Sequence, residues 1–366
     1  MSHPKTLSAP VPPGGTIGIL GGGQLGRMLA LAAARLGLKA HIYSDESDAP
    51  AFQVCDAHTL ARYDDETALT KFAAHCDAIT YEFENVPSAA AALLSELKPT
   101  NPNARALAVA QDRLEEKNFI RKLGLNTADF VAVDSGETAR NAFAMLGTNR
   151  AILKTCRLGY DGKGQMKVAS AEETAVGFET FACPSLLESF VDFAFEASVI
   201  AARGMNGEFA AYDPPENFHE HHILRRSTVP ARLSPAQCAE AKDIAKRMMD
   251  ALGYIGVLAV ELFVTKEGAL LVNEFAPRVH NSGHWTLEAC AVSQFEQHIR
   301  AIAGWPLGDP ARHSDAVMEN IIGEEAADWQ ALAARGGALH LYGKSEIRPM
   351  RKMGHITHLK PKTGAH

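Results

Sequence analysis

The apolar residues of this chain fall into short runs separated by breaks rich in glycine, proline and asparagine. The run TIGIL (16–20) predicts a buried strand, and the alanine- and leucine-rich segment after it predicts a helix that continues to about Leu36 and ends at Gly37. KAHIYS (39–44) predicts a second strand, and DAITYEF (77–83) predicts a later one. Because a strand, a helix and a strand in this order form a parallel unit, the sequence predicts a parallel α/β sheet here.

The middle of the chain changes in character. KPTNPNARA (98–106) is an irregular connection and a predicted domain boundary. A charged helix is expected over AQDRLEEKNFIRKLG (110–124). A second amphipathic helix is expected over SPAQCAEAKDIAKRMMDALG (234–253), with Ser234 as its N-cap and Gly253 as its C-cap.

Several segments between and after these helices carry the patterns of strands. FVAV (130–133) predicts a strand, which a helix near 137–146 follows, and residues 151–168 predict a strand, a loop and a strand. Residues 185–203 alternate in their later part, as a pair of strands does. VLAVELFVTKEGALLVNEFAPR (257–278) predicts a β-hairpin. The chain therefore combines an α/β part with an α+β part.

Length and composition narrow the class of protein. At 366 residues the chain is long for a single core, so two or three domains are expected. A formal net charge of −7 argues against nucleic acid or a membrane surface as the main partner, but it leaves small anionic ligands open. No window approaches the roughly 18 uninterrupted apolar residues of a membrane span.

The N-terminal residues and the cysteines bear on location. Residues 1–13 are proline-rich and lack the apolar core of a signal peptide, so they predict a disordered tail. The six cysteines are scattered and form no CxxC pair. This usage is typical of reduced thiols in a cytoplasmic protein.

A glycine-rich loop, RLGYDGKGQ (157–165), follows the strand predicted at residue 151. Gly159 and Gly164 have the spacing of a phosphate-binding P-loop, but Gln165 and Met166 stand where that motif requires Lys and Ser or Thr. No helix follows the loop. We interpret it as a flexible flap between two strands, in which glycine supplies mobility and close approach to a ligand.

An earlier glycine motif has the spacing G-x-G-x-x-G. Gly21, Gly23 and Gly26 lie between a predicted strand and a predicted helix, and Asp45 follows about 20 residues later, as in dinucleotide-binding units. The same turn serves any phosphate at a helix N-terminus, and it also serves a purely structural connection. Phosphate binding, NAD or FAD binding and a structural turn all stay open. The Gln24 amide inside the turn could reach a ligand.

The predicted hairpin carries two carboxylates. If its turn has two or four residues about Glu267 and Gly268, Glu261 lies directly opposite Glu274 on one face, with Cβ atoms roughly 5 Å apart. Like charges this close are destabilising unless a cation lies between them, and Mg²⁺ prefers carboxylate and phosphate oxygens. The alternative is a solvated acidic pair, and a three-residue bulged turn would shift the pairing by one residue and weaken the metal interpretation. Asn273 is expected on the other face.

Three polar clusters complete the candidates. His219, His221 and His222 suggest either a zinc site or a single histidine that contacts a nucleotide. The loop after the hairpin gathers the polar side chains of Arg278, His280, Asn281, Ser282 and His284, which we expect to belong to a site. The basic run near the C-terminus favours an anionic substrate over an ordinary surface patch, and it contains Lys344, Arg348, Arg351 and Lys352.

Several of these motifs, in this order, resemble the ATP-grasp superfamily and, within it, the N5-carboxyaminoimidazole ribonucleotide synthetases of de novo purine biosynthesis. The resemblance rests on GGGQLGRM (21–28), TYEFENVP (80–87), AQDRLEEKNF (110–119), LKTCRLGYDGKGQ (153–165), NEFAPRVHNSGHWT (273–286) and RPMRKMGH (348–355). It covers nearly the whole chain, and the motifs are jointly far more specific than the first glycine motif alone.

The resemblance implies a Rossmann-like N-terminal domain (14–103), an ATP-grasp domain (104–300) with lobes at about 115–186 and 187–300, and a small C-terminal domain (301–366). It implies an ATP-dependent ligase that phosphorylates bicarbonate to carboxyphosphate and carboxylates the amine of 5-aminoimidazole ribonucleotide. ADP and phosphate are released. Mg²⁺ is the implied cofactor, and the family tends to form homodimers.

The resemblance also implies roles for residues at matching positions. ATP contacts are expected from Arg113, Lys154, Gly159, Tyr160, Asp161, Gly162, Lys163, Gly164, Gln165, Glu188, Ser189, Phe190, Val191, Glu196, His219, Asn273 and Glu274. Ribonucleotide contacts are expected from Gln24, Leu25, Glu82, Tyr160, Asn281, Ser282, Lys344 and Arg351. Catalytic roles are expected for Asp161, Arg278, His280 and Lys344, with Glu261 and Glu274 as metal ligands. Asp161 would be the base that takes a proton from the attacking amine, or else a residue that only stabilises the loop.

Three other functions compete with this one. A different ATP-grasp ligase, such as the formate-using glycinamide ribonucleotide transformylase, would share the ATP side but not YEFENV together with HNSGHW and the Lys344 and Arg351 pair. An NAD-dependent oxidoreductase rests on residues 16–45 alone. A regulator that binds nucleotides without catalysis would tolerate loss of Glu261 and Glu274, yet both are present.

Overall fold

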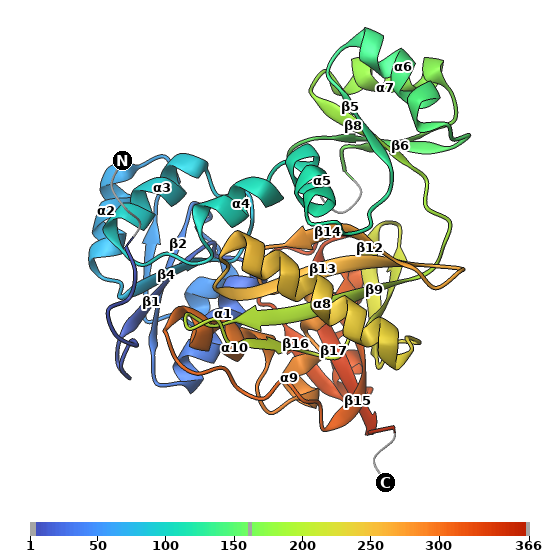
Figure 1. Ribbon diagram of the computed structural model, residues 1–366. Coiled ribbons are helices and arrows are strands. Elements are labelled where there is room, and N and C mark those ends of the chain that lie inside the picture. The colour runs from blue at the N-terminus through green and yellow to red at the C-terminus, as the bar shows by residue number, and fades with distance from the viewer. Residues whose placement is uncertain (1–4, 160–162, 364–366) are drawn as a thin grey trace.

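The computed structural model describes residues 5–159 and 163–363, and the described chain forms three sheets (Figure 1). The first sheet has the strand order β3-β2-β1-β4, and all its neighbours are parallel, as predicted. Its strands are β1 (Thr16–Leu20), β2 (Lys39–Ser44), β3 (Ala57–Leu60) and β4 (Ala78–Tyr81). The helical segments beside them are α1 (Gln24–Arg35), η1 (Pro50–Gln53), α2 (Glu66–Ala74) and α3 (Ser88–Leu97).

The second sheet is antiparallel and forms the lobe at the upper right of Figure 1, with helices on one face. Its order is β5-β8-β6-β7, from β5 (Phe130–Val133), β8 (Ser185–Ser189), β6 (Ala151–Thr155) and β7 (Gln165–Val168). The covering helices are α6 (Gly136–Leu146) and α7 (Ala171–Phe181). Their buried alanines meet Leu153 and Leu187 of the sheet in a small separate core.

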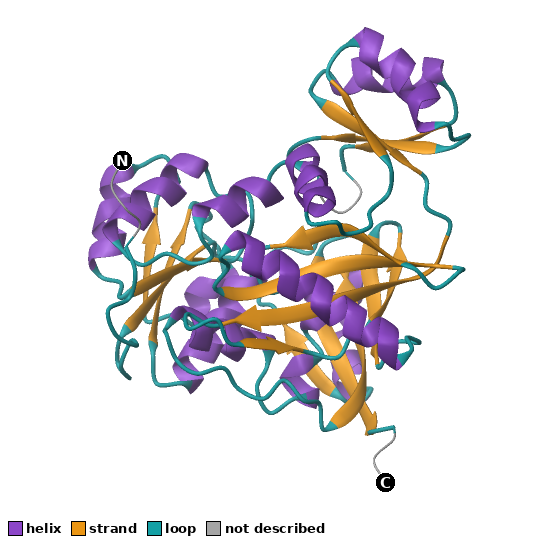
Figure 2. Cartoon of the chain, viewed as in Figure 1, coloured by secondary structure: helices purple, strands orange, loops and turns teal. Residues whose placement is uncertain are grey.

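The third sheet is the largest and runs β14-β13-β9-β11-β12-β15-β17-β16, with β10 beside β9 (Figure 2). Its strands are β9 (Phe193–Arg203), β10 (Phe209–Ala211), β11 (Glu216–Glu220), β12 (Ile223–Val229), β13 (Gly256–Thr265), β14 (Leu270–Ala276), β15 (Ser314–Ile322), β16 (Ala338–Leu341) and β17 (Lys352–Pro361). The accompanying helices are α8 (Pro235–Leu252), η2 (Asn281–Gly283), α9 (Thr286–Ala289), α10 (Gln294–Ile302), η3 (Gly323–Asp328) and α11 (Trp329–Ala334). The C-terminal strands thus continue the sheet that carries the hairpin.

One sequence prediction about the elements is wrong. Residues 185–203 do form two strands, but β8 joins the small sheet and β9 the large one, because each finds its partners on distant segments. The charged helix expected over 110–124 is confirmed as α5 (Arg113–Lys122), which begins three residues later than expected and follows α4 (Ala104–Ala110). The Asp112 side chain caps α5 by accepting hydrogen bonds from the amides of Leu114 and Glu115, which separates the two helices.

The predicted disordered tail is also wrong for residues 5–13, while residues 1–4 lie outside the described chain. Val11 is buried, its N–H donates to the carbonyl of Ala303 at 2.9 Å, and the Trp305 indole donates to the Val11 carbonyl at 2.7 Å. The segment is ordered because docking buries its apolar side chains and provides partners for its backbone groups.

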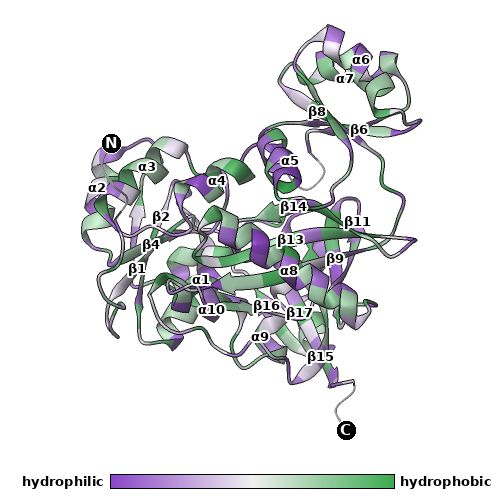
Figure 3. Ribbon diagram, viewed as in Figure 1, coloured by the Kyte–Doolittle hydropathy of each residue, from purple (hydrophilic) through white to green (hydrophobic). Residues whose placement is uncertain are grey.

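Helix α8 confirms the sequence prediction. Ser234 accepts a hydrogen bond from the Gln237 amide, and Gly253 has a φ of 58°, where glycine carries no Cβ penalty. Hydrophilic and hydrophobic segments alternate along the helix in Figure 3, and Ile244, Met248 and their neighbours pack into the core. Among the described residues, no helix has the length and apolar character needed to cross a membrane.

Candidate active site

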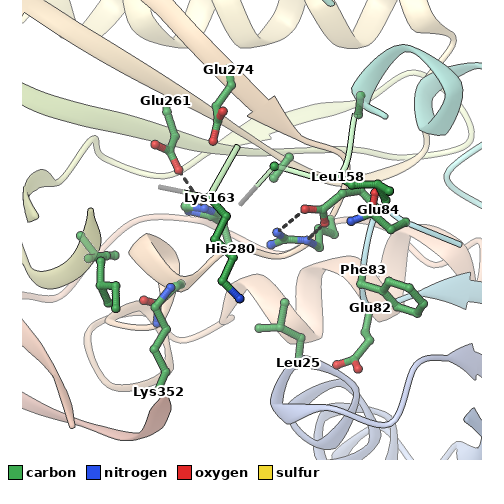
Figure 4. A pocket seen from close by; sticks show the side chains of 18 of the residues that line it. Leu25, Glu82, Phe83, Glu84, Leu158, Lys163, Glu261, Glu274, His280 and Lys352 are labelled. Carbon is green, nitrogen blue, oxygen red and sulfur yellow. Dashed lines mark hydrogen bonds and ion pairs between the residues drawn. The ribbon is translucent and has the colours of Figure 1, made fainter. Parts of the chain in front are cut away.

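The hairpin of β13 and β14 brings two carboxylates together above a cleft (Figure 4). Glu261 pairs directly with Glu274 across the two strands, as predicted. The reason differs from the one expected. The turn has three residues, 266–268, closed by a hydrogen bond from the Thr265 amide to the Ala269 carbonyl at 3.0 Å. Such a turn would shift the pairing by one residue.

A bulge in β14 restores the pairing. Leu262 lies opposite Val272, whereas Glu261 lies opposite Glu274, so Asn273 is the extra residue. The bulge removes the strict alternation that would place Asn273 on the other face. Its side-chain oxygen, Oδ1, is buried and has no hydrogen-bond partner in the described structure. A buried carbonyl oxygen without a donor next to two carboxylates fits an oxygen-binding cation.

The two carboxylates hold their charges unequally. Burial raises the pKa of Glu274, and the charge of Glu261 raises it further. Burial also opposes ionisation of Glu261, but the hydrogen bond from His280 and the nearby positive charges outweigh burial and lower the pKa of Glu261 to about 2. A third buried carboxylate, Glu116 of α5, accepts a hydrogen bond from the Phe275 amide at 2.7 Å. Burial and the charge of a neighbouring carboxylate therefore raise the pKa of both Glu116 and Glu274.

Glu188 forms a different kind of acidic group. Its carboxylate lies between the ammonium groups of Lys154, at 2.7 Å, and Lys117, at 3.2 Å, and all three side chains are at most 10% exposed. Burial opposes ionisation of Glu188, but the two lysine charges outweigh burial and lower its pKa to about 2. The Lys117 ammonium also donates to the Asn273 carbonyl at 2.8 Å, which ties this group to the hairpin. The Glu188 side chain is thus engaged by the lysines.

The base of the glycine flap is anchored by Arg113. Its guanidinium donates to the carbonyls of Thr155 and Gly159, each at 2.9 Å, and the backbone approaches so closely that a Cβ on Gly159 would collide with it. Gly164 has a φ of 67°, in the left-handed region that favours glycine. Lys163 lines the cleft, and Gln165 begins β7. Tyr160, Asp161 and Gly162, for which ATP, substrate and catalytic roles were expected, lie outside the described residues.

The connection between the two sheets contains Ser189, Phe190 and Val191, which lead from β8 to β9. The backbone amides of Ser189 and Phe190 donate to the carbonyls of Asp129 and Arg150, so they are already used within the small lobe. Further along, the His219 ring nitrogen Nδ1 lies 2.7 Å from the Glu196 carboxylate. These two predicted nucleotide contacts therefore form one pair on neighbouring strands.

Histidines 221 and 222 lie in the turn between β11 and β12, apart from the Glu196 pair. The His222 ring lies 3.3 Å from the side-chain amide of Gln165, and both histidines have positive φ. No three His, Cys, Asp or Glu side chains gather into a metal-binding group in the described residues, so a zinc site here has no structural support.

Arg278 is held by a carboxylate that the sequence interpretation left without a role. The guanidinium Nε and NH2 groups donate to the two Glu84 oxygens at 2.5 and 3.2 Å, and NH1 donates to the Val279 carbonyl at 3.1 Å. Glu84 comes from the loop after β4, so the pair joins the first sheet to the polar loop after the hairpin. The two-point geometry is the strong form of an arginine–carboxylate bond.

The glycine motif at the start of α1 holds an anion that belongs to the protein. The amides of Gly23 and Gly26 both donate to the Glu82 carboxylate, the latter at 2.6 Å, and a Cβ at Gly23 would lie 2.6 Å from a Glu82 oxygen. Burial raises the pKa of Glu82, and the two amides with the Arg278 and Lys344 charges offset part of that rise. The amides expected to bind a phosphate are thus occupied by Glu82.

The basic run near the C-terminus reaches the same cleft. Lys344 and Arg351 line it, and the Lys344 ammonium donates to the Lys352 carbonyl at 2.7 Å. Burial, followed by the charge of Arg351, lowers the pKa of Lys344 to about 8. Gln24 and Leu25 line the cleft from the N-terminus of α1.

The cleft that joins these groups has a volume of about 890 Å³. The predicted residues on its wall are Gln24, Leu25, Glu82, Arg113, Gly159, Lys163, His219, Glu261, Glu274, Arg278, His280, Asn281, Lys344 and Arg351. Asn281 lies on the wall, but its amide pairs reciprocally with the amide of Asn320. Ser282 is fully buried and its hydroxyl bonds to that of Ser198. Lys154 and Glu188 lie beneath the wall.

Sequence reasoning missed Glu84, Glu116 and Lys117. Glu84 was accessible in principle, because Glu82 and Glu84 alternate after a buried strand and so share one face. Glu116 and Lys117 carried no such signal, since charged residues on an amphipathic helix are normally solvated.

Comparison with known proteins gives a consistent result along the chain. Family models match for the ribonucleotide synthetase preATP-grasp domain over residues 15–111, the ATP-grasp domain over 118–295, and the phosphoribosylaminoimidazole carboxylase C-terminal domain over 316–365. The N5-carboxyaminoimidazole ribonucleotide synthase of Brucella melitensis is 52% identical over 96% of this chain and 98% of its own length.

Two solved structures share the whole architecture. The ADP complex of an N5-carboxyaminoimidazole ribonucleotide synthetase superposes with a TM-score of 0.92 at 41% identity, over 97% of this chain and 94% of the other. The Aspergillus clavatus synthase, in complex with ADP and 5-aminoimidazole ribonucleotide, superposes with a TM-score of 0.86 at 29% identity, over 95% and 94%.

Proposed function

This chain belongs to the N5-carboxyaminoimidazole ribonucleotide synthase family of ATP-grasp ligases, and from that premise we propose how its residues divide the reaction. The enzyme uses ATP and bicarbonate to carboxylate 5-aminoimidazole ribonucleotide in purine biosynthesis. Bicarbonate is a poor electrophile, and phosphorylation supplies it with a leaving group. The protein must therefore neutralise phosphoryl charge, hold carboxyphosphate away from water, and present the amine.

Mg²⁺ is the metal that the hairpin fits. Two opposed carboxylates and an amide oxygen without a donor offer only oxygen ligands, and Mg²⁺ typically completes its shell with substrate phosphates and water. Glu261 and Glu274, with Asn273, would hold the ion. When bound, it would neutralise phosphate charge and fix the triphosphate. The raised pKa of Glu274 supports this role, because a neighbouring cation is what would keep both carboxylates ionised.

The ATP half of the cleft is assigned to α5, the flap and the link between sheets. Lys154 would place its positive charge beneath the phosphates, while Glu188 keeps its ammonium in position. Arg113 holds the base of the flap, so that the flap can cover the triphosphate and exclude water. Glu196 would accept hydrogen bonds from the ribose, with His219 fixing its orientation.

The acyl-transfer half is assigned to the polar loop and the first sheet. Arg278 would bind the anionic bicarbonate and carboxyphosphate with the N–H groups that remain outside its bond to Glu84. Lys344 and Arg351 would bind the phosphate of the ribonucleotide. Glu82 would face its sugar or amine from the glycine turn. Asp161, by the family resemblance, is the proposed base for the amine.

The observation that carries this proposal is the meeting of Glu261, Glu274, Arg278, Lys344 and Arg351 in one cleft. These residues come from the hairpin, the loop after it and the C-terminal run, and together they provide a metal site and two anion sites. The test is ADP release from ATP, Mg²⁺ and bicarbonate, with and without 5-aminoimidazole ribonucleotide. Strong stimulation by the ribonucleotide is expected. A folded, metal-loaded protein that shows none would refute the assignment.

Replacing Asp161 separates its two proposed roles. Asp161→Asn should leave ATP binding intact and reduce carboxylation, because it removes a proton acceptor without changing size. Product formation is measured against ADP release under the same conditions. If this variant carboxylates the ribonucleotide at the wild-type rate, Asp161 is not the base and only stabilises the loop.

We also propose a cytoplasmic homodimer. The described cysteines are all free, which agrees with a reducing compartment, and the family tendency supports the dimer. Light scattering after size exclusion tests the oligomeric state, and a monomeric mass would overturn that part of the proposal.

A further inference from the structure

Both ring nitrogens of His280 have hydrogen-bond partners, an acceptor beside Nε2 and donors beside Nδ1. Nε2 lies 3.0 Å from an oxygen of Glu261, and this contact is drawn as a dashed line in Figure 4. An ionised carboxylate only accepts hydrogen bonds, so Nε2 must carry the ring hydrogen. On the other side, Nδ1 lies 2.9 Å from the Ser282 hydroxyl, and the Ser282 backbone N–H points to it at 3.4 Å. A backbone N–H only donates, so Nδ1 is an acceptor.

A buried chain of hydrogen bonds continues behind Ser282 into the large sheet. The Ser282 hydroxyl lies 2.7 Å from that of Ser198 on β9. The Asn217 amide on β11 donates to the Ser198 oxygen at 2.9 Å, and the Ser227 hydroxyl on β12 donates to the Asn217 carbonyl oxygen at 2.7 Å. The three serines are 0% exposed and Asn217 is 5% exposed, so bulk water does not compete for these bonds.

The direction of this chain follows from one hydrogen on each hydroxyl. Because Ser198 accepts from Asn217, its own hydrogen is available for Ser282. Ser282 then donates to His280 Nδ1. This arrangement leaves the ring hydrogen on Nε2, facing Glu261. The Glu261 carboxylate, which only accepts, and the Ser282 backbone N–H, which only donates, both agree with this direction.

We propose that Asn217 is a positioning residue that acts through Ser198 and Ser282 to keep His280 in the Nε2–H tautomer. In this state His280 donates to one oxygen of Glu261 and fixes the carboxylate, leaving its other oxygen for the metal. Groups that orient a metal ligand in this way typically contribute about 10- to 100-fold to metal affinity. The second part of the proposal rests on the metal-binding role proposed for Glu261.

Asn217→Asp tests the direction of the chain. The ionised side chain has nearly the same size but only accepts, so Ser198 must donate to it and Ser282 must donate to Ser198. His280 must then donate from Nδ1. We expect the ring ¹⁵N signals of His280, measured in metal-free protein at fixed pH, to change from the Nε2–H pattern to the Nδ1–H pattern. The KM for Mg²⁺ should rise about 10-fold or more, while the KM for the ribonucleotide stays unchanged.

Two controls separate this effect from general damage. Asn320→Asp places a carboxylate at another buried amide that contacts the same loop, outside the chain of hydrogen bonds, so His280 should keep its wild-type signals. Ser198→Ala combined with Asn217→Asp cuts the chain, so the wild-type tautomer should return. If Asn217→Asp does not fold, Asn217→Ala serves instead, and the signals should move toward an average of the two tautomers.

The possible results distinguish the parts of the proposal. An Nε2–H pattern that persists in folded Asn217→Asp, or unchanged signals in Asn217→Ala, overturns the role of Asn217. A changed tautomer with an unchanged KM for Mg²⁺ overturns the link to the metal and counts against Glu261 as a ligand. It leaves the tautomer assignment itself standing.

Discussion

Two groups of carboxylates lie at or beneath the wall of the same cleft, and their charges are balanced in different ways. Glu188 lies between Lys154 and Lys117, so its charge is compensated within the protein. Glu261 and Glu274 lie opposite each other on the hairpin. These two carboxylates repel each other, and the hydrogen bond from His280 to Glu261 and the charges of nearby lysines and arginines offset that repulsion in part.

The difference shows which group has its charges neutralised within the protein and which group needs a ligand. A buried ion pair is costly to break, because removing either partner leaves the other charge buried and unpaired. Buried like charges are tolerated when something outside the chain neutralises them, and a site that binds a metal is such a case. Removing one member of the first group should therefore destabilise the folded protein. The second lowers its stability until a cation binds.

The largest expected effect comes from breaking the balanced group. Glu188→Ala leaves two buried ammonium groups without their carboxylate, and we expect a loss of about 3–5 kcal/mol in the free energy of unfolding. Urea denaturation followed by circular dichroism measures it. Asp192→Ala is the matched control, because that carboxylate also pairs with a lysine but both side chains are at least 60% exposed. The control should change stability by less than about 1 kcal/mol.

Equal denaturation midpoints for the two variants would contradict this view of Glu188. They would mean that Lys154 and Lys117 find other partners or lose their protons at little cost.

The next largest effect comes from the hairpin pair, Glu261 and Glu274. Here we expect a substitution to raise the free energy of unfolding or leave it unchanged. Glu274→Gln removes a proposed metal ligand, so we expect kcat/KM for ATP to fall roughly 100-fold. In the absence of metal, the same change removes a repulsion and should leave the protein as stable as wild type or more stable. Turnover at several Mg²⁺ concentrations and unfolding with a chelator measure the two results.

Glu267→Gln, in the exposed turn of the same hairpin, is the control for Glu274→Gln. It should alter neither quantity. A Glu274→Gln enzyme with wild-type turnover would show that the metal assignment is wrong.

The sequence predicted the hairpin pair because period-two patterns and turn residues are local signals. The parallel sheet of the first domain and helix α8 were predicted for the same reason. The expected turn length was wrong, and the bulge at Asn273 compensated for it. A bulge has no dependable signal in a single sequence, because it depends on how the partner strand is held.

The remaining parts of the site depend on contacts between distant segments. Glu82 occupies amides that lie 56 residues earlier in the chain, so the motif alone could not show that its anion is internal. The assignment of β8 and β9 to different sheets likewise depends on partners far along the chain. Glu116 and Lys117 look like an ordinary charged helix surface until β14 and β8 cover them.

The smallest expected effect concerns Glu116 and depends on pH. Burial, and then the charge of Glu274, raise the pKa of Glu116 to about 8 in the folded protein. The folded state therefore holds a proton that the unfolded chain releases above its ordinary pKa of 4.5. The stability contributed by this group is complete below the ordinary pKa and is lost as the pH rises toward 8. The side chain of the Glu116→Gln variant cannot titrate. Its free energy of unfolding should therefore rise by about 1–2 kcal/mol relative to that of wild type between pH 5.5 and 7.5.

This pH dependence also tests whether Glu116 belongs to the unbalanced group. The denaturation midpoints of wild type and Glu116→Gln are compared at about pH 5.5 and about pH 7.5, with a chelator present in every sample. When both proteins also carry Glu274→Gln, the difference between their denaturation midpoints should shrink, because the charge of Glu274 no longer raises the pKa of Glu116. A gap that is the same at both pH values would show that Glu116 is already ionised at the lower one. The hairpin would then tolerate a third buried charge without a cation, and the contrast with Glu188 would fail.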